Sequence, residues 1–127
     1  MSASNQTPPL VLIVDDEEAI REVVRDILEL SGIETILAAN GQEAIELFTQ
    51  HHDRIRVILL DLRMPIMSGT ETYHRLRELD ADVRVILSSG YDDKVSSLNF
   101  HVDEAVFFLR KPYAMDALLT CIQDALN

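Results

Sequence analysis

The chain has 127 residues, enough for one domain with its own core, and its apolar fraction of 47% is that of a globular protein. The formal charge of −11 comes from 22 acidic and 11 basic residues without a basic cluster, which argues against direct binding to nucleic acid. No apolar run approaches the roughly 20 residues that cross a bilayer, and the N-terminus lacks a signal-peptide pattern. Because Cys121 is the single cysteine, no internal disulfide can form, and we expect a cytoplasmic chain without membrane contact.

Five apolar runs have the length of strands, and their low alternation is expected of parallel strands covered on both faces. They span Leu10–Val14, Thr35–Ala38, Val57–Leu60, Val83–Leu87 and Ala105–Leu109. Helical patterns lie between them: a stripe over Ile20–Leu28, a segment after the N-cap residue Asn40, one opening near Ser68, a weak stripe over about Asp93–Phe100, and an apolar face over Met115–Leu126. This alternation predicts an α/β domain, a flavodoxin-like three-layer sandwich of five βα units around a five-stranded parallel sheet. We expect the domain to fill residues 10–127 and residues 1–9 to form a flexible polar lead-in.

Carboxylates follow two of the predicted strands. Asp15 and Asp16 come directly after the first run, and Asp61 comes directly after the third. In a flavodoxin-like order these two strands are neighbours, so the three carboxylates would share a pocket at the carboxyl edge of the sheet. Clustered carboxylates repel one another, and a hard divalent cation such as Mg²⁺ relieves that repulsion. The alternative, that acids here merely charge a helix N-terminus, suits Glu17 and Glu18 better.

A hydroxyl group and an ammonium group are predicted at the same edge. Ser88 and Ser89 directly follow the fourth apolar run and end that strand, and Lys111 follows the fifth run. Beside carboxylates that can receive a phosphoryl group, this lysine would be a counter-charge rather than ordinary solvated surface. Pro112 directly after it predicts a constrained turn, in which the Lys111–Pro112 bond is a candidate for the cis form.

Four motifs resemble the receiver domain of two-component response regulators. They are VDDEE after the first run, LLDLRMPIMSG after the third, SSGY after the fourth and FFLRKPY around the fifth. The resemblance covers about Leu10 to Leu126, and it implies a module that takes a phosphoryl group from the phosphohistidine of a histidine kinase or a histidine phosphotransfer protein. The segments SSGYDD and FFLRKPY are similar to those of receivers attached to hybrid sensor kinases. If this chain is part of such a protein, the parent protein would be a kinase.

The resemblance implies roles for individual residues. Asp61 matches the phospho-acceptor, and Lys111 matches the lysine that pairs with the acyl phosphate. Asp16 and Asp61 match the direct Mg²⁺ ligands, joined by the backbone carbonyl of Arg63. Asp15 is similar to the acid that holds the metal through water. In this mechanism alignment and charge neutralisation do most of the work of phosphoryl transfer.

The same resemblance implies a conformational switch. Ser89 is assigned as the hydroxyl that moves toward the phosphoryl oxygens, because it stands 28 residues after Asp61 and 22 before Lys111, spacings common in receivers. The aromatic residue three positions before the lysine, which turns inward, is here Phe108. Tyr is frequent at that position, and Phe cannot make the hydroxyl contact that Tyr can.

Two expectations concern the phosphorylated state. Arg63 and Tyr91 would flank the path of the hydrolytic water, and we expect these large side chains to prolong the life of the acyl phosphate. Phosphorylation is also expected to alter the surface of the fourth helix, fifth strand and fifth helix, a candidate homodimer interface. That surface carries Lys94, Asp103, Arg110 and Asp116.

Three other interpretations are less favoured. A Mg²⁺-dependent hydrolase of the haloacid-dehalogenase type also forms an aspartyl phosphate, but it needs a second acid two residues after the nucleophile, where this chain has Arg63. A receiver that is not phosphorylated and serves only for docking is disfavoured because every charged site residue is present. A nucleotide-binding Rossmann domain is disfavoured because no G-x-G-x-x-G follows the first run. The resemblance implies mainly a signalling module, with phosphoryl acceptance and slow autodephosphorylation.

Overall fold

The computed structural model describes residues 8–63, 67–89 and 106–127. Nine elements follow one another in this part of the chain: β1 Leu10–Val14, α1 Glu18–Leu30, β2 Glu34–Ala38, α2 Gly41–Gln50, β3 Ile55–Asp61, α3 Gly69–Leu79, β4 Arg84–Ser89, β5 Val106–Arg110 and α4 Met115–Leu126. The helix expected at about Asp93–Phe100 lies outside the described residues. The helix labelled α4 is therefore the one that the sequence predicts as the fifth.

The strands form one parallel sheet in the order β2-β1-β3-β4-β5. This order confirms the flavodoxin-like prediction and makes β1 and β3 neighbours. The strand order reverses at this pair, because the chain moves outward to β2 on one side and to β4 and β5 on the other. Ligands of open α/β sheets bind beyond the carboxyl ends of the strands at such a point.

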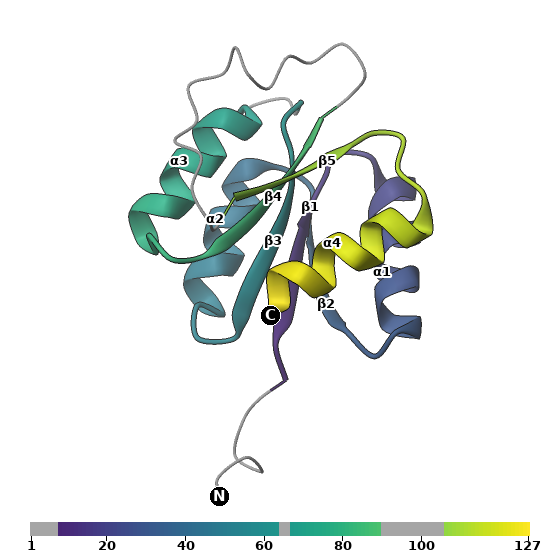
Figure 1. Ribbon diagram of the computed structural model, residues 1–127. Helices are drawn as coiled ribbons and strands as arrows, with labels where there is room; N and C mark the ends of the chain where they lie inside the picture. Colours follow the sequence, from purple (N-terminus) through teal and green to yellow (C-terminus); the bar gives the residue numbers. More distant parts are fainter. Residues whose placement is uncertain (1–7, 64–66, 90–105) are drawn as a thin grey trace, which may run out of the picture.

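Helices cover both faces of the sheet, as Figure 1 shows. Helices α2 and α3 contribute Phe48 and Leu76 to the core on one face, together with Leu60 of β3. Helices α1 and α4 contribute Leu28 and Leu118 to the core on the other face. Both faces of the central strands are therefore buried, which explains why their sequences show so little alternation.

Local signals set the helix ends. The side chain of Asn40 caps α2 by accepting a hydrogen bond from the Glu43 backbone N–H at 2.8 Å, and Ser68 caps α3 in the same way through Glu71 at 3.1 Å. After α1, Gly32 has a φ of +81°, the left-handed conformation that glycine adopts with least cost. The predicted N-cap residue Asn40 is thus confirmed, and α3 opens beside Ser68 as expected.

The bounds of β1 are the predicted ones, and those of the other strands differ from the prediction by at most two residues at either end. Strand β4 begins at Arg84 rather than Val83, because the Val83 N–H bonds the Asp80 carbonyl in a turn, at 3.3 Å, instead of joining the ladder. The same strand continues past Leu87 through two serines. In the part of the chain that the structure describes, no helix is both long enough and apolar enough to cross a membrane.

Candidate functional site

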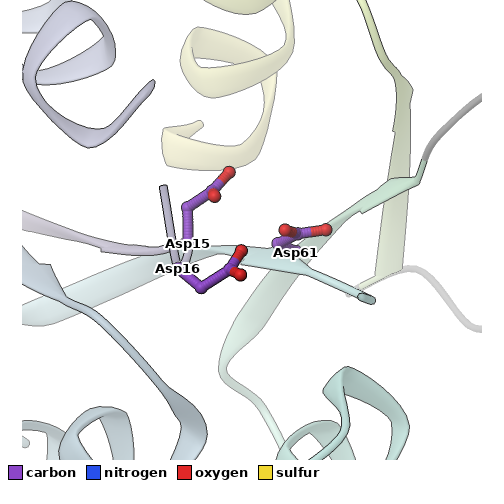
Figure 2. Close-up of side chains that lie close together, drawn as sticks. All are labelled: Asp15, Asp16 and Asp61. Atoms are coloured by element: carbon purple, nitrogen blue, oxygen red, sulfur yellow. The ribbon is translucent and has the colours of Figure 1, made fainter. Parts of the chain in front are cut away.

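Three carboxylates meet at the carboxyl edge of the sheet, as the sequence analysis expects. Asp15 and Asp16 follow β1 and Asp61 is the last residue of β3, and one carboxylate oxygen of each lies within 4.8 Å of the others. Figure 2 shows the three side chains beside one another at this edge. Asp15 and Asp61 are buried, while Asp16 is exposed. Topology alone brings these residues together, because 45 positions separate Asp16 from Asp61.

Lys111 joins two of these carboxylates. Its Nζ lies 2.8 Å from Oδ2 of Asp15 and 3.3 Å from Oδ2 of Asp61. Burial alone would lower the pKa of this lysine, but its hydrogen bond to Asp15 and the charges of Asp61 and Asp15 raise the pKa above its ordinary value. Lys111 therefore carries a full positive charge at neutral pH and balances one of the three negative charges.

The surroundings of Asp61 disfavour the charged form of its carboxyl group. Burial is the largest influence and raises the pKa of its carboxyl from 3.8 to about 6, and the Asp15 charge acts in the same direction. The Arg63 backbone N–H, which donates to Oδ1 of Asp61 at 3.1 Å, and the nearby Lys111 oppose that rise. At neutral pH Asp61 is thus largely ionised, with its negative charge only partly compensated.

The Asp15 carboxylate is held by a backbone N–H group as well as by Lys111. Oδ1 of Asp15 accepts the Glu17 N–H at 3.0 Å, and the Arg21 guanidinium donates to the Asp15 carbonyl at 2.7 Å. These bonds tie the start of α1 to the end of β1. Both oxygens of Asp15 are therefore engaged, one by Glu17 and the other by Lys111.

The chain after Asp61 packs tightly against the start of α3. The Gly69 N–H donates to the Leu62 carbonyl at 3.1 Å, and a Cβ atom at Gly69 would lie 2.5 Å from the backbone oxygen of Asp61. Real Cβ atoms do not approach a backbone atom so closely. A residue without a side chain is thus required where α3 supports the acceptor strand.

The structure places the other predicted site residues to different degrees. Ser89 is the last residue of β4, so its backbone is at the site edge, but its side chain lies outside the described residues, as does Tyr91. Arg63 is exposed beside Asp61. Phe108 on β5 is 42% exposed. The peptide bond between Lys111 and Pro112 is cis, the form for which the sequence made it a candidate.

Two residues near the site have features that the sequence analysis did not predict. Ser88 is fully buried, and its hydroxyl has no hydrogen-bond partner. Tyr113 is partly buried, and burial is the main reason that the pKa of its phenol rises to about 12, with Lys111, Asp15 and Asp61 close enough to act on it. The Pro-Tyr pair after the lysine was the available signal for Tyr113, whereas nothing local distinguishes Ser88 from its neighbour.

Comparison with known proteins identifies the family. The model of the response regulator receiver domain matches residues 11–123. The chain belongs to the response regulator receiver family. This receiver is 30% identical over 118 residues to the chemotaxis protein CheY of Bacillus subtilis, covering 92% of this chain and 97% of that protein.

Receivers within larger proteins are similar as well. The autoinducer 1 sensor kinase/phosphatase LuxN of Vibrio campbellii is 33% identical over 125 residues, which are 97% of this chain but 14% of LuxN. Among solved structures, a receiver domain protein from Clostridium thermocellum superposes with a TM-score of 0.83 at 27% identity and covers 94% of both chains. This receiver therefore corresponds to all of some relatives and to a small part of others.

Proposed function

We propose that Asp61 accepts a phosphoryl group from the phosphohistidine of a histidine kinase or a histidine phosphotransfer protein. The observation that carries this proposal is the buried Asp61 carboxylate, which ends β3 within reach of Lys111 and of two further carboxylates. Its attack forms a bond from a carboxylate oxygen to phosphorus and breaks the phosphorus–nitrogen bond of the donor, whose imidazole leaves. Receiver domains act in two-component systems, so the family supports this chemistry.

The acidic cluster has the donor chemistry that Mg²⁺ requires. Among the described residues it gathers three carboxylates against the single ammonium of Lys111, so one more cation would relieve their repulsion. Burial is the main reason that the pKa of Asp61 is raised, and the Asp15 charge adds to it. Asp16, Asp61 and the Arg63 carbonyl would hold the ion directly, and Asp15 would hold it through water. When bound, the ion supplies positive charge beside the phosphoryl oxygens.

The remaining site groups would complete the charge balance. Lys111 already lies 3.3 Å from Oδ2 of Asp61, so a small rotation turns its ammonium toward a phosphoryl oxygen of the acyl phosphate. Ser89 at the end of β4 would add a hydroxyl donor, and its movement with that of Phe108 would carry the change to the surface. The added charge of the phosphoryl group drives this rearrangement.

An apolar groove beside the site is suited to the protein that delivers the phosphoryl group. It has a volume of about 510 Å³ and lies between α1 and the start of α4; its lining includes Ile20, Val23, Lys111, Tyr113 and Met115. Val23 and Met115 are 57% and 55% exposed, which is high for large apolar side chains. Since Lys111 lines the groove and also contacts Asp61, a protein seated there has its surface next to the acceptor. We infer that the phosphohistidine protein docks in this groove, and that the two proteins meet in the cytoplasm.

Replacement of the acceptor tests the proposal. With acetyl phosphate and Mg²⁺, the wild-type chain should gain one phosphoryl group by mass spectrometry, whereas Asp61→Ala should gain none and should remain folded by circular dichroism. Asp53→Ala, at an exposed acid in the turn before β3 and thus at the opposite end of that strand from Asp61, is the control and should behave as wild type. Phosphorylation of the Asp61 variant would refute the assignment. An unreactive wild type would favour the alternative of a receiver used only for docking, and the match over residues 11–123 already decides against the hydrolase.

A further inference from the structure

Ser88 has a buried hydroxyl that the proposed mechanism does not use. The residue is 1% exposed, and its Oγ is the one buried side-chain oxygen or nitrogen without a hydrogen-bond partner among the residues that the structure describes. A hydroxyl that loses water on folding and gains no partner destabilises the protein, and native folds contain few such groups. An alanine would fill this place in β4 without that penalty.

The sheet places Ser88 directly beside the acceptor. Ser88 and Asp61 are register partners in the pairing of β3 with β4, and the Leu62 N–H donates to the Ser88 carbonyl at 2.9 Å. Neighbouring strands lie about 4.8 Å apart, so the side chains of register partners on one face are in reach of one another.

The two side chains lie on the same face of the sheet. The preceding pair in the same register and on the same face, Leu59 and Ile86, belongs to the core between the sheet and helices α1 and α4. Because side chains alternate between faces with a period of two, Asp61 and Ser88 continue this series. The other partner of Ser88, Leu109 on β5, belongs to the same core.

The Asp61 carboxylate has other partners at present. Oδ1 accepts the Arg63 N–H at 3.1 Å, and Oδ2 lies 3.3 Å from the Lys111 ammonium. Phosphorylation changes this arrangement, because one oxygen becomes bonded to phosphorus and Lys111 turns to the new phosphoryl charge. Asp61 then carries an acyl phosphate, a mixed anhydride, and its oxygens are no longer held by the ion pair. The Arg63 N–H remains one neutral donor to this group, and a second neutral donor can be accommodated.

We propose that Ser88 is a positioning residue for the phosphorylated state, in which its hydroxyl donates a hydrogen bond to an oxygen of phosphorylated Asp61. This inference rests on the proposed function of Asp61. The hydroxyl destabilises the unphosphorylated receiver and becomes satisfied when the acceptor is modified. Ser88 therefore shifts the balance between the two states toward the phosphorylated one, separately from Ser89.

Binding of a phosphoryl mimic measures this coupling without relying on turnover. Beryllium trifluoride, which attaches to an ionised aspartate as a phosphoryl group does, is titrated into the chain at saturating Mg²⁺ while amide NMR spectra are recorded. Ser88→Ala should bind the mimic about fivefold more weakly than wild type, the size expected for one lost neutral hydrogen bond. The unmodified Ser88→Ala protein should be as stable as wild type or more stable in urea, because it lacks the unpaired hydroxyl.

Two variants separate this role from general loosening of the strand. Ser88→Thr keeps the hydroxyl and should restore the affinity; if the extra methyl group prevents folding, Ser88→Cys, of nearly the same size and with a weak donor, should bind with intermediate affinity. Ile86→Val removes one methyl group from the same face of β4 and should lower stability in urea while leaving the affinity for the mimic unchanged.

The outcomes are distinct. Equal affinity of wild type and Ser88→Ala overturns the inference, as does an equal loss of affinity in Ile86→Val. A hydroxyl satisfied in the same way in both states, for instance by a buried water, also gives equal affinities. If wild type and Asp61→Ala bind the mimic alike, the proposed function itself fails, whatever Ser88 does.

Discussion

The raised pKa of Asp61 makes the stability of the metal-free receiver depend on pH. In the folded chain burial raises the pKa of this carboxyl to about 6, against 3.8 for the free group. Between these two values the folded state binds the proton and the unfolded state does not, so unfolding becomes easier as the pH rises from about 4 to about 6. Over this pH range the ionisation of Asp61 lowers the free energy of unfolding by up to about 3 kcal/mol.

Urea unfolding in the presence of a chelator, at intervals from pH 4 to pH 7, measures this dependence. Asp61→Asn should abolish the decline and should be more stable than wild type at pH 7, because it removes the buried charge. Asp53→Asn, at an exposed position, should keep the wild-type profile. A wild-type stability that rises steadily over this range would contradict the predicted direction.

The individual carboxylates of the cluster should differ in how much each contributes to Mg²⁺ binding. Asp16 is exposed, whereas both oxygens of Asp15 already have partners, the Glu17 N–H and Lys111. We expect Mg²⁺ to raise the melting temperature of wild type by mass action, and Asp16→Asn to remove most of that rise while Asp15→Asn removes less.

Thermal melts at several Mg²⁺ concentrations decide this prediction. Glu18→Gln is a suitable control, because it removes a charge from the same acidic run without touching the cluster. A melting temperature that responds to Mg²⁺ equally in Asp16→Asn and wild type would show that the ion binds elsewhere.

At the scale of whole elements, a substitution on the surface of α1 should impair docking of the phosphohistidine protein without impairing phosphorylation itself. Val23 lines the apolar groove and is 57% exposed, so Val23→Glu places a charge where the phosphohistidine protein would bury an apolar surface. We expect about tenfold slower transfer, roughly 1.4 kcal/mol, from a histidine kinase selected for its transfer to the wild-type chain. Phosphorylation by acetyl phosphate should be unchanged.

The same helix provides the control for this experiment. Leu30 at the end of α1 is 88% exposed and does not line the groove, so Leu30→Glu makes the same chemical change away from it. Transfer slowed equally by Leu30→Glu would show that charge on α1 in general, rather than the groove, is responsible.

Helix ends could be predicted from sequence where the capping signal is local. Strand bounds were predicted less accurately, because pairing with neighbouring strands sets them. The caps Asn40 and Ser68 were predictable because each acts within its own helix turn. Strand β3 begins two residues before the predicted Val57, because the exposed Arg56 interrupts the apolar run but not the backbone ladder. For the same reason β4 extends through Ser88 and Ser89.

The candidate site was likewise predictable from the sequence only in part. The meeting of Asp15, Asp16 and Asp61 followed from strand order, because each residue stands at the carboxyl end of a strand or just beyond it. The unpaired hydroxyl of Ser88 could not be predicted, because it depends on which face the serine takes and on what packs around it. Two adjacent serines look alike in sequence, and the sequence alone does not show that the hydroxyl of Ser88 is buried.

At the scale of the whole molecule, phosphorylation is expected to promote association. Strand β5 lies at the edge of the described sheet, and it presents the 42% exposed Phe108 together with the exposed Arg110. Asp116 on α4 is also exposed, so in a two-fold dimer an Arg110 of one copy can face an Asp116 of the other. The inward movement expected of Phe108 would reshape this surface only when Asp61 is modified.

Light scattering on the chain with Mg²⁺, with and without beryllium trifluoride, should show a change from the mass of one chain to that of two. Because each copy carries a charge of −11, moderate salt should strengthen the dimer by screening the repulsion between copies. Phe108→Ser should keep the mimic-bound chain monomeric, whereas Leu30→Ser, at an exposed apolar residue on a different element, should leave the dimer intact. A mimic-bound wild type that stays monomeric at every salt concentration would show that this surface serves a different partner.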